Sequence, residues 1–135
     1  MVEERLTDGR RIAELLASEL DGLEGIFARV TVTDPDHDVT PTPDGAYAYT
    51  VTIGEESDGE EPRTLATVAV HPERAHVEFE RGQGVAADVG EEQGLRVRPK
   101  AVEPPRTLVF VEDGGEVKRA VAVFEAVVRD VENGS

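Results

Sequence analysis

The chain has 135 residues, a length that suits one domain with a single hydrophobic core. Its 29 acidic residues against 14 basic ones give a net charge of −15, and the bases are twelve Arg and only two Lys. The absence of Cys excludes disulfides, thiolate metal sites and thiol nucleophiles. No secretory signal and no apolar run near the roughly 20 residues of a membrane span are evident, so we expect a cytoplasmic protein.

The surplus of carboxylates indicates a particular working environment. Like charge in this excess destabilises a compact chain at low ionic strength, and molar salt screens the repulsion. Aromatic residues make up only 4% of the chain, whereas Val and Ala are abundant. In composition the chain resembles the small acidic proteins of extremely halophilic archaea. That resemblance implies adaptation to salt and transfers no catalytic or binding residue.

The first half of the chain predicts one helix followed by several strands. The helix spans residues 8–22 and carries apolar side chains at helical spacing, namely Ile12, Leu15, Leu16, Leu20 and Leu23. Strand-like alternation then occurs four times, at residues 27–33, 46–53, 64–70 and 76–80. Hairpin-type loops between consecutive strands predict antiparallel pairing. On the last strand we expect Val77 and Phe79 to face the core, and His76 and Glu78 to face away from it.

The second half begins with a segment, residues 81–106, that has weaker patterns. It predicts a short helix at 85–93, a strand at 95–98 and an irregular, proline-rich stretch up to residue 106. The apolar run 107–111 is typical of a central strand covered on both faces. A final helix is expected to start at a capping box formed by Asp113 and Glu116. Its apolar stripe consists of Val117, Val121, Phe124, Val128 and Val131, and it ends at Asn133-Gly134.

These elements predict an α+β fold for a single domain over residues 1–135. We expect an antiparallel sheet of about five to six strands, packed with the N- and C-terminal helices as a two-layer sandwich. The order of elements is similar to that of bacterial type III secretion chaperones and related protein-binding modules. This similarity concerns element order only and implies a binding module, without transferring any residue.

The most informative local feature is a basic segment in the acidic chain. Residues 81–106 carry a net charge of +1, which leaves −16 on the remainder. Arg96, Arg98, Lys100 and Arg106 are therefore candidate partner-binding residues that would meet an acidic protein or a phosphate. The simpler interpretation is that these bases pair internally with nearby carboxylates.

A second candidate is a metal site formed by His71, His76 and Glu78. Across a short hairpin the two His side chains would face each other beside Glu78, and two imidazoles with one carboxylate suit a divalent metal. The alternative is a pair of exposed His residues that flank a surface turn. Their spacing spans a turn rather than one helix face and therefore lacks the HExxH signature.

Two further motifs fail on inspection. Asp34, Asp36 and Asp38 resemble the start of a calcium loop, but Val39 and Gly45 stand where an EF-hand needs Gly and Glu. Residues 82–87 match G-x-G-x-x-A, yet the preceding strand belongs to an antiparallel hairpin rather than to a parallel βαβ unit. We expect a salt-adapted loop and a glycine turn instead.

No catalytic signature stands out, so the sequence favours a non-enzymatic module that binds a protein partner or a second copy of itself. No cofactor is expected. Nucleic acid is not an expected partner, because a broad basic face and aromatic stacking platforms are poorly supplied. The alternative is a small-molecule or metal-binding protein or an enzyme, with a pocket between sheet and helices. Its candidate polar residues are Tyr47, Tyr49, His71 and His76.

Overall fold

The computed structural model describes residues 8–22, 30–54 and 61–133, and it confirms the α+β class. The helices are α1 (Gly9–Gly22), α2 (Gln83–Glu92) and α3 (Val117–Glu132), with a short 3-10 turn (Gly114–Glu116) leading into α3. The strands are β1 (Val30–Thr33), β2 (Ala46–Ile53), β3 (Arg63–Val70), β4 (Ala75–Phe79), β5 (Val97–Lys100) and β6 (Arg106–Val111).

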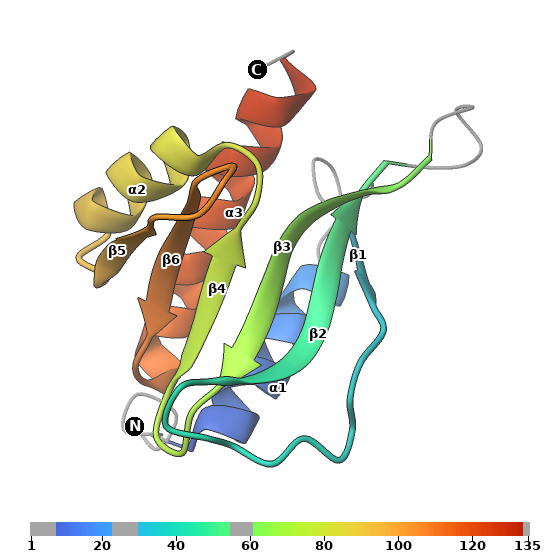
Figure 1. Cartoon of the computed structure of the whole chain (residues 1–135), viewed down its shortest axis with the longest axis vertical. Helices are drawn as coiled ribbons and strands as arrows, with labels where there is room; N and C mark the ends of the chain where they lie inside the picture. Colours follow the sequence, from blue (N-terminus) through green and yellow to red (C-terminus); the bar gives the residue numbers. More distant parts are fainter. Residues whose placement is uncertain (1–7, 23–29, 55–60, 134–135) are drawn as a thin grey trace.

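The strands form one antiparallel sheet in the order β1-β2-β3-β4-β6-β5. Figure 1 shows α1 and α3 behind this sheet, and α2 packs against α3, β5 and β6. The opposite face of the sheet, turned toward the viewer, carries no helix from the described part of the chain. We term it the open face, because its side chains rather than a second layer form the surface.

Alternation along β4 positions the core as the sequence predicts. Val77 and Phe79 are fully buried beneath the helices, and the Phe79 ring lies 4.9 Å from the Phe124 ring of α3. His76 and Glu78 alternate with them along the strand and therefore project to the open face. They are nevertheless buried there, which is unusual for polar side chains and requires partners.

Helix α1 starts at the Asp8 side chain, whose Oδ1 accepts a hydrogen bond from the Arg11 amide at 3.1 Å. Its apolar stripe is buried against the sheet, and the Tyr49 hydroxyl donates to the Ala13 carbonyl at 2.8 Å. Burial raises the pKa of Tyr49, so the phenol stays protonated and able to donate. Leu23 and the predicted strand residues 27–29 lie outside the described residues.

The 3-10 turn that leads into α3 begins at the predicted cap. Asp113 Oδ1 accepts from the Glu116 amide at 2.9 Å, and Glu116 Oε1 accepts in return from the Glu112 amide at 2.8 Å. Four members of the predicted stripe are buried, and Val121 is half-buried at its edge. The N-terminal cap and the stripe together fix which face of α3 meets the sheet.

The expected bounds of the strand before β6 are wrong, and so is the expected cover of β6 on both faces. The edge strand is Val97–Lys100 rather than 95–98, and it includes Pro99. The Phe110 amide bonds to the Arg96 carbonyl at 2.9 Å, so residues 96, 98 and 100 face β6 with their backbone groups. Pro99 therefore turns its donor-less nitrogen toward solvent, where an edge strand tolerates proline.

Strand β6 is an inner strand, but helices cover only one of its faces. On the open face, Phe110 is 4% exposed because the Arg74 guanidinium lies over its ring, 4.4 Å from the centroid. Arg74, from the turn before β4, thus covers this face of β6, where the sequence predicts a second layer.

Candidate functional site

Basic side chains gather on the open face over β4, β6 and β5. They are Arg74, Arg96, Arg98, Lys100 and Arg106, facing the acids Glu78, Glu80 and Glu112. This surface is net positive in a chain whose total charge is −15. The four bases singled out in the sequence therefore lie on one surface, and the sheet adds Arg74 from a turn that no sequence signal connected to them.

Glu78 is the centre of this surface. Its side chain is 10% exposed, and its Oε1 accepts from Lys100 Nζ at 3.0 Å while its Oε2 accepts from Arg106. Burial by itself would raise the pKa of Glu78, but the hydrogen bonds from Arg106 and Lys100 outweigh it and lower that pKa. In the described part of the chain, the Nε of Arg106 is the only buried side-chain nitrogen or oxygen without a partner.

We expect Glu78→Gln to lower the free energy of unfolding by about 2 kcal/mol, since it removes the charge that two cations share in a mostly buried site. The matched control is Glu125→Gln, which breaks an exposed pair with Arg129 at 3.2 Å and should cost about 0.5 kcal/mol or less. Urea denaturation of both variants measures the difference. Equal losses in the two variants would contradict a special role for Glu78.

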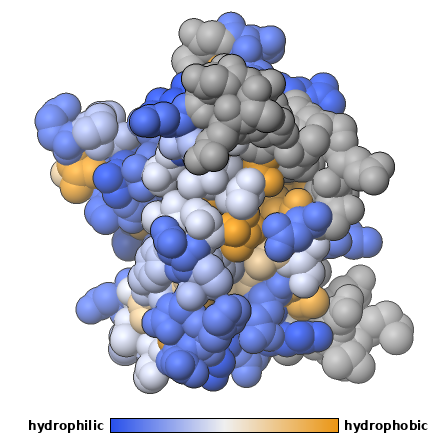
Figure 2. Space-filling model, turned by 90° about the vertical axis from the view of Figure 1, so that its right-hand side faces the viewer, coloured by the Kyte–Doolittle hydropathy of each residue, from blue (hydrophilic) through white to orange (hydrophobic). Residues whose placement is uncertain are grey.

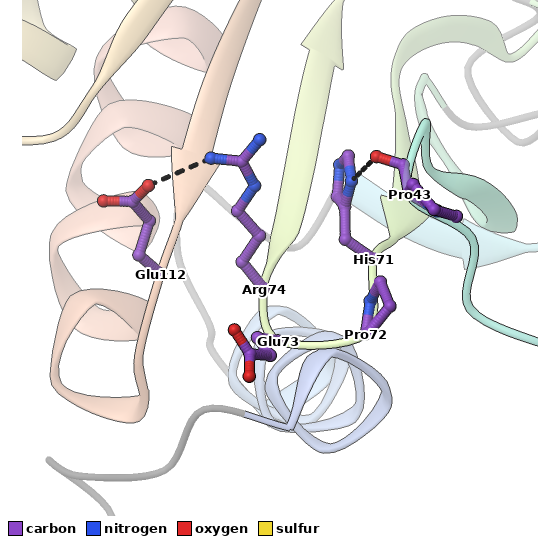
Figure 3. A pocket seen from close by; sticks show the side chains of 6 residues that line it. All are labelled: Pro43, His71, Pro72, Glu73, Arg74 and Glu112. Carbon is purple, nitrogen blue, oxygen red and sulfur yellow. Dashed lines mark hydrogen bonds and ion pairs between the residues drawn. The ribbon is translucent and has the colours of Figure 1, made fainter.

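The four candidate bases differ in their partners. Lys100 and Arg106 pair with Glu78, and Arg96 lies 3.8 Å from Glu112. Glu112 also binds Arg74 at 3.1 Å, as Figure 3 shows. Arg98 is exposed, and its guanidinium has neither an ion-pair nor a hydrogen-bond partner among the described residues. Of the four, Arg98 is therefore the base that is free to meet another molecule.

His71 and His76 bond directly to each other. His71 Nε2 lies 2.7 Å from His76 Nδ1. His71 Nδ1 lies 2.9 Å from the Pro43 carbonyl oxygen, as Figure 3 shows. Their side chains are only 6% and 8% exposed, and both rings pack against Phe110. The interpretation as exposed His residues around a surface turn is thus wrong.

The hydrogen bonds define the tautomers of this pair. A carbonyl oxygen only accepts, so His71 Nδ1 carries a hydrogen and the Nε2 of neutral His71 has a lone pair. His76 therefore donates from Nδ1, which leaves its Nε2 as the acceptor. Burial first, and the neighbouring His71 second, lower the pKa of His76 to about 4. At neutral pH the His76 ring is therefore uncharged.

Gly45 covers the imidazole pair from the side of β2. It has φ +97, and a Cβ there would lie 2.9 Å from His76 Cε1 and 3.2 Å from His71 Nε2. Only glycine combines this left-handed conformation with so close an approach. The sequence Pro43-Asp44-Gly45 predicts a turn, but nothing in it predicts contact with His71 and His76.

A groove of about 540 Å³ runs across the open face beside these groups. Its floor consists of Thr67, Ala69, His76, Glu78 and Leu108. Asp44 and Tyr47 form the wall on the β2 side, and Arg98 and Lys100 form the wall on the β5 side. We term it the open-face groove. It brings together Tyr47 and His76. The sequence predicts both for a pocket between sheet and helices, whereas they line a groove on the opposite face of the sheet.

The remaining candidates do not join this groove. Tyr49 lies on the helix side, in a separate groove of about 380 Å³ between α1 and residues 32–39. Figure 2 views the molecule from the β1 side and shows apolar surface among hydrophilic residues. His71 lines a third hollow, of about 550 Å³, at the turn before β4 (Figure 3).

The geometry does not gather the three proposed metal ligands around a common point. One ring nitrogen of His71 is hydrogen-bonded to one of His76, and the two carboxylate oxygens of Glu78 pair with Lys100 and Arg106. Across residues 8–22, 30–54 and 61–133, no group of three His, Asp or Glu side chains is arranged to hold a metal ion. The glycine motif at 82–87 follows β4, whose two pairings are antiparallel, so it is no dinucleotide-binding unit.

The fold and these surfaces define a small α+β domain with one helix-covered sheet face and one open, charged face. The chain belongs to a family of unknown function, DUF7993, whose model matches residues 1–135. No match was found among curated proteins or among solved structures. No helix within the described ranges is long and apolar enough to cross a membrane. The resemblances in composition and element order stay predictions.

Proposed function

We propose that this chain is a salt-adapted, non-enzymatic interaction module of the cytoplasm that binds an acidic partner protein through the β5 side of its open face. The observation that carries the proposal is Arg98, an exposed guanidinium without a partner, at the rim of a positively charged surface. The rest of the chain is strongly acidic and repels acidic proteins. This surface is where charge complementarity favours contact.

The contact is expected to use side chains rather than addition of a strand. Strand β5 is short and contains Pro99, which removes one backbone donor from the outer edge. Arg98 and Lys100 instead project from the open face. A second copy of this chain also offers acidic surface, so self-association is another outcome that the test distinguishes.

The test is quantitative affinity capture from a lysate of the source organism in molar potassium chloride. We expect Arg98→Glu to abolish capture of the specific partner, whereas Lys118→Glu retains it. Lys118 is exposed on α3, and no partner for its side chain is seen within the described ranges. Both variants should keep the circular dichroism spectrum of the original protein. Capture that is unchanged in Arg98→Glu, or enrichment of the bait alone, would overturn the proposal.

The salt-adaptation part has its own test. We expect the melting temperature to fall as potassium chloride is removed, because repulsion among the surplus carboxylates is then unscreened. Replacing the exposed acids Asp88, Glu91 and Glu92 of α2 by Lys should reduce this dependence. A melting temperature that is constant from molar salt to dilute buffer would contradict salt adaptation.

A further inference from the structure

We propose that the open-face groove binds a small zwitterion, with its ammonium group at the β2 wall and its carboxylate at the β5 wall. The sheet order separates these walls by β3, β4 and β6, and their charges are opposite. Asp44 stands on one wall and Arg98 on the other, both exposed and neither with a side-chain partner in the described structure. This inference shares Arg98 with the protein-interaction proposal, whereas Asp44 and Tyr47 belong to it alone.

The β2 wall has the features that recognise an ammonium group. Tyr47 is 43% exposed, yet its hydroxyl donates to the Asp34 carbonyl at 3.0 Å and bonds to Thr50 Oγ1 at 2.6 Å. The ring is thereby held in place while part of its surface lies open to the groove. A fixed aromatic ring beside the carboxylate of Asp44 attracts a cation both through its π-face and by charge.

The β5 wall has the features that recognise a carboxylate. The guanidinium of Arg98 has no partner among the described residues. Lys100 Nζ donates to Glu78, and because an ammonium group has three hydrogens, it can also donate to a ligand. Because Lys100 and Arg106 neutralise Glu78, this floor residue does not repel an anion. Lys100 reaches as far as β4, which lies two strand spacings, or about 10 Å, from β2. A ligand with several atoms between its charges suits that span.

The floor supplies a hydrogen-bond acceptor in the middle. His76 donates from Nδ1 to His71, which leaves Nε2 with a lone pair. Nε2 has no partner, yet it is not among the buried unpartnered atoms of the described chain, so it reaches solvent. The bond to His71 orients this lone pair. An ammonium N–H or a hydroxyl of the ligand can donate to it.

The walls also exclude other ligands. A simple carboxylate is attracted by Arg98 and Lys100 but repelled by Asp44. A simple amine is attracted by Asp44 but repelled by Arg98 and Lys100. Only a molecule with both charges satisfies both walls, which distinguishes an ω-amino acid from its singly charged analogues.

The experiment titrates the protein with δ-aminovalerate, valerate and pentylammonium, and follows the His76 imidazole nitrogens by long-range proton–nitrogen NMR. We expect δ-aminovalerate to bind about tenfold more tightly than either analogue, since each analogue lacks one charge-assisted contact. The Nε2 resonance of His76 should move with δ-aminovalerate and pentylammonium, which both carry an ammonium group, and not with valerate. Equal binding of valerate and δ-aminovalerate, or no shift at Nε2 with any probe, would overturn the proposal.

Two variants assign the walls. Asp44→Asn should weaken δ-aminovalerate about tenfold and leave valerate unchanged, whereas Arg98→Gln should weaken both. Asp88→Asn, an exposed acid on α2, is the matched control and should change neither. If Asp44→Asn binds δ-aminovalerate as the original protein does, the proposed ammonium site is wrong. The two proposals share Arg98, but Asp44 plays no part in the capture experiment, so a failure at Asp44→Asn overturns the zwitterion site and leaves the capture proposal standing.

Discussion

Gly9→Ala is expected to lower the free energy of unfolding by roughly 2–4 kcal/mol. A Cβ at this position would lie 1.9 Å from the His71 carbonyl oxygen and 2.5 Å from that of Arg74. Both are backbone atoms, so neither can rotate away as a flexible side chain would. The Gly9 amide also donates to the Pro72 carbonyl at 3.2 Å, which holds the start of α1 against the turn before β4.

The cost arises because α1 must move as a unit to relieve this clash. Moving it strains the buried contacts of Ile12 and the bond from Tyr49 to the Ala13 carbonyl. Gly84→Ala is the control, since a Cβ there meets no atom within 4 Å and replaces glycine in α2. It should be neutral or stabilise by about 0.5–1 kcal/mol. Urea denaturation in molar potassium chloride compares the two, and equal effects would refute the argument.

Acid is expected to destabilise the protein through His76. The pKa of His76 is lowered to about 4 in the folded chain, against about 6.5 when unfolded. As the pH falls below about 6.5, the unfolded chain takes up a proton at His76 that the folded chain refuses. This contribution is therefore complete above pH 6.5 and is lost progressively down to about pH 4, by roughly 3 kcal/mol in total.

A variant comparison isolates this effect from the many carboxylates. Protonation of Glu78 acts in the same direction at lower pH, because its pKa is lowered by its two cations. His76→Asn keeps a donor toward His71 and removes the titrating ring, so its stability should change much less between pH 6.5 and pH 4. His37→Gln, on an exposed loop, should behave like the original protein. An unchanged pH dependence in His76→Asn would contradict the assignment.

Much of this fold could be predicted because local periodicity carries it. The alternation of His76, Val77, Glu78 and Phe79 predicts the correct faces of β4, and the Asp113 cap predicts the start of the 3-10 turn that leads into α3. The edge strand could not be placed from local pattern. Whether Pro99 is tolerated depends on which side of β5 pairs with β6, and that is decided by tertiary structure.

The candidate site was only partly predictable for the same reason. The meeting of His71 and His76 follows from a short hairpin, but their burial does not. It depends on Phe110, Gly45 and the Pro43 carbonyl, which come from other segments of the chain. Likewise the pairing of Lys100 and Arg106 with Glu78 needs the order β4-β6-β5, which no local motif encodes.

The turn from His71 to Arg74 has a kinetic consequence. It forms hydrogen bonds with Gly9 of α1, with the Pro43 carbonyl of the long loop, and with Glu112 just after β6. Its own hairpin, β3 with β4, closes a short loop and is entropically inexpensive. The other three contacts join parts of the chain 28 to 63 residues away, since Pro43 is 28 residues from His71 and Gly9 is 63 from Pro72. Folding should thus start at this hairpin and proceed by successive docking of distant segments, which makes it slow and gives substitutions in the turn the highest φ-values.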